Sequence, residues 1–220
     1  MFGLRTVRVF SVVLHCLATA NAIPNNDSPS HDLVARAFPP APDLTIASWI
    51  WTTTAGISGV PPGTSTFRLT FKPDPTLPLA NISVAISADN AYNFYFNGTL
   101  YGSGYDWQSP NIWTINNVPS TAPWVFSIVA TNYALGLDDF SVNPAGMIAS
   151  FVASSASLQR SYTWFTGQPG NTWKATDLVL ENFYSPTLDD SAWPPAVFET
   201  VHGGGPWGFL PPPNAACRIN

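Results

Sequence analysis

Hydrophobic and polar residues alternate along most of the chain after residue 45. In the run 66–72, Phe67, Leu69 and Phe71 occupy every second position. Because successive side chains of a β-strand point to opposite faces, this spacing predicts strands with one buried face. Similar patterns predict further strands at 82–86, 91–96, 111–116, 124–131 and 146–153, and the segment 176–181 is compatible with a short strand.

The pair Asn97-Gly98 stands between two of these runs and is a hairpin signal. Both central residues of a type I′ turn need positive φ, which Asn and Gly adopt most readily. We therefore expect 91–96 and 99–102 to be antiparallel partners. Short strands separated by Pro, Gly and Asn turns, with no sustained helical period, predict an all-β fold of the antiparallel β-sandwich or jelly-roll type.

The first 22 residues have the three zones of a secretory signal peptide. Arg5 and Arg8 provide the positive start, the run 9–18 is apolar, and Ala20-Asn21-Ala22 offers a cleavage pattern of small residues. The apolar run is too short for a permanent span of a bilayer core about 30 Å thick. No later segment has the roughly 20 apolar residues that a transmembrane helix needs. We therefore expect a secreted, extracellular protein without a transmembrane segment.

The composition of the rest of the chain suggests how it divides into segments and argues against some classes of binding partner. The segment 23–43 is polar and rich in proline, so we expect a signal peptide at 1–22, a leader or linker at 23–43, a β-sandwich domain at 44–210 and a C-terminal tail at 211–220. Loss of Arg5 and Arg8 with the signal leaves six of the eight basic residues against 13 acidic ones, so the net charge changes from −5 to −7. An acidic chain argues against nucleic acids and anionic membrane surfaces as partners.

Cysteines and sequons fit the export route. Cys16 leaves with the signal, so Cys217 remains without a partner in its own chain and is either a free thiol or the link of a disulfide dimer. Asn26, Asn81 and Asn97 each begin an Asn-x-Ser/Thr sequon and are predicted glycosylation sites.

No convincing catalytic set is present. After the signal the chain has two glutamates, Glu181 and Glu199, so a glycosidase pair would need aspartates as well. The doublets Asp138-Asp139 and Asp189-Asp190 are adjacent, and neighbouring side chains of a strand point apart. Asp189-Asp190-Ser191 is more typical of a turn or a cap. We therefore expect no enzyme, and a small Asp-based hydrolase is the least favoured alternative.

Metal and serine chemistry are weakly indicated too. His31 lies in the leader and His202 is far from it, which disfavours a transition-metal site, and no Gly-x-Ser-x-Gly elbow is present. Asp138, Asp139 and Asn143 could donate oxygens to Ca²⁺, but they lack a ligand-spaced pattern. Solvated loop acids are the better interpretation, so we predict no cofactor and leave Ca²⁺ open.

Nine tryptophans form the third group of candidate residues. Trp49 and Trp51 have the same parity and are expected to share a core face, and Trp124 is also expected in the core. Sugars stack their C–H patches on aromatic faces and need polar partners for their hydroxyls. The aromatics Tyr101, Tyr105, Trp107 and Trp113 lie in or beside a Gly/Ser-rich loop, so we predict a sugar site made of Tyr105, Asp106, Trp107, Gln108, Tyr133, Asp138 and Asp139. The equally weighted alternative is that Trp107 seals one end of the sandwich.

An ordered set of motifs resembles a known family. In chain order it comprises 47–51 (Ala-Ser-Trp-Ile-Trp), Phe67-Arg68, 86–92 (Ile-Ser-Ala-Asp-Asn-Ala-Tyr), 94–98 (Phe-Tyr-Phe-Asn-Gly), 143–149 (Asn-Pro-Ala-Gly-Met-Ile-Ala), 188–193 (Leu-Asp-Asp-Ser-Ala-Trp) and 206–208 (Pro-Trp-Gly). These resemble the galactose-binding-domain-like β-sandwich modules attached to secreted glycoside hydrolases of the rhamnosidase and β-galactosidase type.

The resemblance implies a jelly-roll domain that often binds carbohydrate and does not catalyse, with ligands in the loops at one end. It also implies that Asp89, Asp189, Asp190 and Trp193 are fold determinants. The leading hypothesis is a lectin-like, carbohydrate-binding protein whose partner is a glycan. The alternative is a secreted protein-interaction, cell-wall or effector module on the same sandwich, without sugar binding.

Overall fold

The computed structural model describes residues 41–53, 56–76, 79–119, 123–136, 141–156, 160–170 and 172–215. One short 3-10 helix, η1 (Leu44–Ile46), precedes the strands. The strands are β1 (Ser48–Trp51), β2 (Gly63–Phe71), β3 (Leu79–Asp89), β4 (Ala91–Phe96), β5 (Thr99–Gly104), β6 (Asn111–Asn116), β7 (Trp124–Asn132), β8 (Gly146–Ser155), β9 (Ser161–Phe165), β10 (Lys174–Thr176), β11 (Val197–Val201) and β12 (Asn214–Ala215). Among these described residues, no helix has the length and apolar character that crossing a membrane requires.

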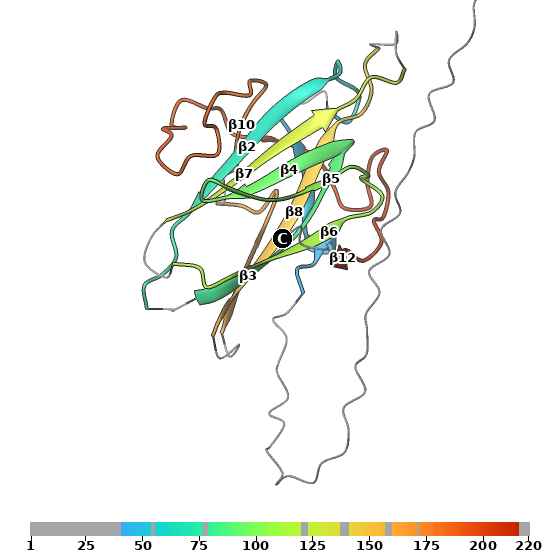
Figure 1. Cartoon of the computed structure of the whole chain (residues 1–220). Helices are drawn as coiled ribbons and strands as arrows, with labels where there is room; N and C mark the ends of the chain where they lie inside the picture. The colour runs from blue at the N-terminus through green and yellow to red at the C-terminus, as the bar shows by residue number, and fades with distance from the viewer. Residues whose placement is uncertain are drawn as a thin grey trace, which may run out of the picture. The chain divides into compact units, whose positions relative to one another are not determined.

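The strands form two sheets that pack as a sandwich (Figure 1). The seven-stranded sheet has the order β11-β1-β8-β3-β6-β12, and β9 also pairs with β8. The five-stranded sheet has the order β10-β2-β7-β4-β5. Neighbouring strands are antiparallel, except that β12 runs parallel to β6. The predicted all-β, antiparallel β-sandwich class is confirmed.

Alternating side chains make the core between the sheets. Phe67 on β2 and Phe126 on β7 face inward from one sheet, and Phe151 on β8 and Ile82 on β3 face inward from the other. All four are fully buried. Full burial of such a side chain stabilises the fold by about 1.5–3 kcal/mol, which explains why the alternating pattern specifies these strands.

Most predicted strands are present, and the hairpin is confirmed. Asn97 and Gly98 have φ of 45° and 88° and connect β4 to β5. The Asn97 side chain also accepts a hydrogen bond from the Val125 amide at 2.8 Å. The strand predicted at 176–181 is wrong in position, because β10 ends at Thr176, where its register with β2 ends. Three strands carry no pattern that we recognised: β9, β11 and β12, the last of which lies in the predicted tail.

The two tryptophans of β1 do not share a face, which corrects the expectation from their parity. A register shift between Trp49 and Ile50 makes the pairing of β1 with β11 irregular. Ile50 and Trp51 both pack in the core, so strict alternation does not hold along β1. Trp51 packs in the core, 5.4 Å from the ring of Phe67. Trp49 packs on the opposite face and stacks on Trp207 at 4.3 Å.

The outer face of the seven-stranded sheet is covered by the chain that follows β11. Trp207 and Leu210 pack there against Trp49, Ala85 and Ile148. The buried Asp89 carboxylate accepts a hydrogen bond from the Trp207 indole at 2.9 Å. Desolvation raises the pKa of Asp89, and this hydrogen bond opposes the change. Asp89 thus has the structural role that the resemblance implied.

The outer face of the five-stranded sheet is covered by residues 177–193, which Arg68 anchors. Its side chain is 1% exposed, and its Nε donates to Asp190 Oδ2 at 2.9 Å. Nη1 donates to the Phe183 carbonyl and, at 3.2 Å, to Ser127 Oγ. Asp189 Oδ1 accepts from the Ser191 amide at 2.9 Å and so shapes a turn. The structural interpretation of the Asp189-Asp190 doublet is confirmed.

Candidate functional site

Several connections meet at one end of the sandwich, which we call the Asn90 end. The registers of β2, β4 and β5 against their neighbours place there the connection 105–110, the described residues of the connections 52–62 and 133–145, and Asn90 between β3 and β4. β10 ends at the same end, beside the start of β2, and delivers Asp177 to it. The predicted loop site and the cavity described next both belong to this end.

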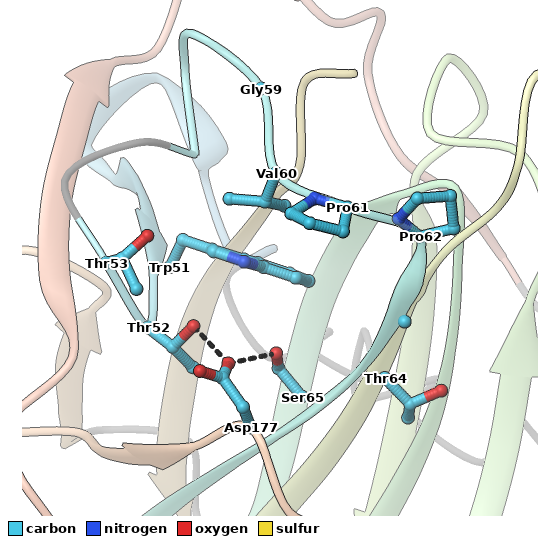
Figure 2. Close-up of a pocket in the computed structure, with 11 residues that line it drawn as sticks. Trp51, Thr52, Thr53, Gly59, Val60, Pro61, Pro62, Thr64, Ser65 and Asp177 are labelled. Atoms are coloured by element: carbon cyan, nitrogen blue, oxygen red, sulfur yellow. Dashed lines mark hydrogen bonds between the residues drawn. The ribbon is translucent and has the colours of Figure 1, made fainter. Parts of the chain in front are cut away.

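A cavity of about 470 Å³ opens between the 52–62 connection and the start of β2. Figure 2 shows the Trp51 indole between the Val60-Pro61 segment on one side and the side chains of Ser65 and Asp177 on the other. The volume falls within the range of about 300–1,000 Å³ that is usual for small-molecule sites. The described residues that line the cavity are Trp51, Thr52, Thr53, Gly59, Val60, Pro61, Pro62, Gly63, Thr64, Ser65 and Asp177.

Asp177 provides the charge of the cavity. Its Oδ1 accepts hydrogen bonds from Thr52 Oγ1 and, at 3.0 Å, from Ser65 Oγ (Figure 2). Oδ2 takes no part in these two bonds, and the residue is exposed. Pairing of Thr176 with Thr66 holds the backbone of Asp177 beside β2. Asp177 therefore contributes an exposed carboxylate to the cavity lining, and hydrogen bonds to Oδ1 hold its side chain.

Glu199 on β11 forms hydrogen bonds with the backbone of the 52–62 connection. Glu199 Oε2 accepts from the Ile57 amide at 2.8 Å. Desolvation raises the pKa of Glu199, while hydrogen bonds from the Ile57 and Gly56 amides oppose the change. A Cβ on Gly56 would lie 2.7 Å from the Ala145 carbonyl, so the loop approaches its neighbours too closely for a side chain there. These contacts hold residues 56 and 57, which precede the cavity-lining residues 59–62 of the same connection.

Backbone hydrogen bonds also join the 52–62 connection to the 133–145 connection. The Val60 amide donates to the Asn143 carbonyl at 2.9 Å, and the Asn143 amide donates back to the Val60 carbonyl at 3.1 Å. The Asn143 side chain is buried, and its Nδ2 donates to the Tyr133 carbonyl at 3.1 Å. Asn143 therefore joins two loops of the Asn90 end.

The predicted site residues 105–108 lie at the Asn90 end but do not line the cavity. Tyr105 is 72% exposed. The Asp106 carboxylate accepts from the Gln108 amide at 3.0 Å and from Ser109 Oγ at 2.8 Å, which shapes the turn. Trp107 is half-buried against the outer-face cluster of the seven-stranded sheet. Gln108 is exposed. Sugar contacts by these residues stay a prediction.

Tyr133, the remaining described residue of the predicted site, lies two strands away. It is 46% exposed, and its amide donates to Asn90 Oδ1 at 2.6 Å. Tyr92 on β4 pairs with Gly104 on one side and with Ala130 on the other, so β4 separates the ends of β5 and β7. Asp138, Asp139, Cys217 and Asn26 lie outside the described residues. Asn81 is half-buried on β3.

Asp190, Glu199 and His202, in the described part of the chain, each have other partners in the fold. Asp190 is paired with Arg68, and Glu199 faces the 52–62 backbone. His202 Nε2 accepts from the Leu210 amide at 3.2 Å, and desolvation lowers its pKa. Within the described ranges, no group of three or more His, Cys, Asp or Glu side chains could hold a metal ion.

Sequence reasoning missed three residues of the cavity, Thr52, Ser65 and Asp177. The two hydroxyl residues and the acid are separated by more than 100 positions, and no local motif joins them. The pairing of β10 with β2 brings them together, and β10 has only three residues. Predicting that these residues are neighbours requires the strand order, which the spacing of residues along the sequence does not give.

Comparison with known proteins places the fold. No protein-family model matches the chain. It is 29% identical over 187 residues to an α-L-rhamnosidase of Streptomyces avermitilis, a match that covers 81% of this chain and 17% of the enzyme. Among solved structures it is similar to a lectin from Pleurotus ostreatus in complex with GalNAc, with 30% identity and a TM-score of 0.65, covering 77% of this chain and 47% of the lectin.

The Streptomyces avermitilis α-L-rhamnosidase complexed with L-rhamnose has 29% identity and a TM-score of 0.65 over 78% of this chain and 16% of the enzyme chain. The chain thus spans less than half of the lectin and about one sixth of the enzyme. The predicted resemblance to the β-sandwich modules of rhamnosidase-type hydrolases is confirmed.

Proposed function

We propose that this chain is a secreted, non-catalytic, lectin-like protein that binds a glycan at the cavity of the Asn90 end. The observation that carries the proposal is the cavity itself, in which an exposed carboxylate and hydroxyl side chains stand beside an apolar wall. The likeness to a lectin crystallised with GalNAc supports it.

The chemistry of the cavity suits a sugar. Asp177 Oδ2 can accept from a sugar hydroxyl, and hydrogen bonds to an ionised acceptor are about twice as strong as neutral ones. The hydroxyl of Thr64 at the rim adds a further donor and acceptor (Figure 2). Pro61 and Pro62 offer apolar surface to the C–H groups of the ring.

The exposed aromatics of the loops add a second surface at the same end. Trp51 is only 2% exposed, so it shapes the cavity wall and offers little area for stacking. Tyr105 and Tyr133 are exposed and have the ring faces that stacking needs. In this proposal the cavity binds one sugar unit, and the two tyrosines contact neighbouring units of a longer glycan.

A binding role without catalysis follows from the same residues. Hydrolysis of a glycoside usually needs two carboxyl groups across the scissile bond, about 5–9.5 Å apart. Of the described residues that line the cavity, Asp177 alone is acidic. The similarity to an α-L-rhamnosidase is accounted for if the chain corresponds to a sugar-binding module and not to the catalytic part of that enzyme.

A glycan array with the wild type and two variants tests the proposal. We expect the wild type to bind a defined set of glycans and Asp177→Ala to weaken that binding at least tenfold. Asp74→Ala is the matched control, because Asp74 is exposed and caps the turn at Thr76 on the β2–β3 connection, at the opposite end. No binding by the wild type, or unchanged binding by a folded Asp177→Ala protein, would contradict the proposal.

A further inference from the structure

Negative charge gathers at the Asn90 end. Asp106 lies on the β5–β6 connection, Asp177 follows β10, and the Glu199 carboxylate reaches beneath the 52–62 connection. Asp89 stands at the end of β3. Asp89 is buried and Glu199 is half-buried. Asp106 and Asp177 are exposed, so a ligand approaching this end meets these two carboxylates.

The lysine and arginine side chains in the described part of the chain do not line the cavity. Lys72 follows β2 and Arg160 precedes β9, and both positions belong to the opposite end of the sandwich. The Arg68 guanidinium is buried and paired with Asp190. The Lys174 ammonium donates to the Trp193 carbonyl at 3.0 Å. Within the described part of the chain, no lysine or arginine lines the cavity.

Hydrogen bonds hold the Asp177 carboxylate in place. Its Oδ1 already accepts from the hydroxyls of Thr52 and Ser65, which fixes the carboxylate plane. Oδ2 is an acceptor only, because an ionised carboxylate has no proton to donate. A sugar hydroxyl or ammonium can satisfy it. The carboxylate of a uronate or sialate, or a sulfate group, cannot donate a hydrogen bond to Oδ2, because at neutral pH it has no proton and is itself an acceptor.

We infer that the cavity selects uncharged or amino-bearing glycans and rejects acidic ones, with Asp177 as the residue that determines this specificity. The inference rests on the proposed glycan site. Two like charges about 4 Å apart repel enough to lower affinity about fivefold when fully exposed to water, and more where the surroundings are less polar. An ammonium on the sugar would be attracted by the same charge.

The experiment uses an array of matched pairs, in which each neutral glycan is printed beside its uronate, sulfated or sialylated form. For every neutral glycan bound by the wild type, we expect the acidic form to bind at least fivefold more weakly at about 0.05 M salt. The difference should shrink at about 0.5 M salt, because screening shortens the range of the repulsion. Equal or tighter binding of the acidic forms would overturn this inference and leave the proposed function standing.

Two variants assign the effect to one residue. Asp177→Asn keeps an oxygen for Thr52 and Ser65, so it should fold as the wild type does and bind acidic and neutral forms within twofold of each other. Asp106→Asn removes a charge from the same end outside the cavity, and it should keep at least half of the discrimination. An equal loss in both variants would show that the field of the whole end is responsible and not Asp177. Absence of binding to every glycan would overturn the proposed function as well.

Discussion

Removal of the Asp190 carboxylate should destabilise the whole sandwich, although Asp190 lies in a surface loop. The Arg68 guanidinium that it pairs with is 1% exposed, and Asp190 itself is 20% exposed. In Asp190→Ala the cation would stay buried on β2 and keep only neutral partners, among them the Phe183 carbonyl and Ser127 Oγ.

The magnitude follows from that environment. Breaking a buried ion pair by removing one partner costs about 3–5 kcal/mol, and a hydrogen bond to a charged group is worth about 1.5–3 kcal/mol. Because Asp190 is partly exposed, water can replace part of its bond to Arg68. We therefore expect Asp190→Ala to lower the free energy of unfolding by about 2–4 kcal/mol.

Urea unfolding followed by tryptophan fluorescence measures this difference as a shift of the midpoint. Asp189→Ala is the matched control, because the neighbouring carboxylate is exposed and bonds to the Ser191 amide of its own turn. If Asp190→Ala were no less stable than Asp189→Ala, the reasoning from the buried guanidinium would be refuted.

Two further predictions concern buried polar and aromatic groups. The folded-state pKa of Asp89 is raised above 3.8 by burial, so its contribution to stability is present below that value and is lost as pH rises through the folded pKa. Asp89→Asn should therefore gain stability relative to the wild type between pH 3 and 7, and a difference independent of pH in urea titrations would contradict this. A Cβ at Gly102 would lie 2.0 Å from the Trp113 ring. Gly102→Ala should lower the free energy of unfolding by about 1–3 kcal/mol through overpacking, and an unchanged urea midpoint would argue against it.

The strands that could be predicted are those whose own residues carry the alternation. Phe67 and Leu69 fall on one face of β2, and both are buried in the core. β9 and β11 have a weaker pattern, since Tyr162 is 41% exposed and Phe198 is 54% exposed. Their apolar residues are not confined to a buried face, so periodicity does not reveal them.

The Gly/Ser-rich segment after the hairpin shows a different limit. The strand was predicted to end at Gly102 with a Gly/Ser-rich loop after it, but Ser103 and Gly104 also belong to β5. Position 102 needs a glycine, because the Trp113 ring occupies the space that a side chain there would fill. Trp113 itself is buried, and its indole donates to the Tyr92 hydroxyl at 2.9 Å. Composition alone does not distinguish a flexible glycine from one that makes room for a neighbour.

The position of β1 has a consequence for biosynthesis. β1 pairs with β8 and with β11, and the partner of Ser48 is Val201. At a synthesis rate of about 5–20 residues per second, β1 therefore waits roughly 8–30 s before the strand at its outer edge has been made. Throughout that interval Trp49 lacks its stacking partner, Trp207, as well. The seven-stranded sheet thus closes only after Val201 has been made, and until then the Ser-Trp-Ile-Trp strand needs protection from pairing with other chains.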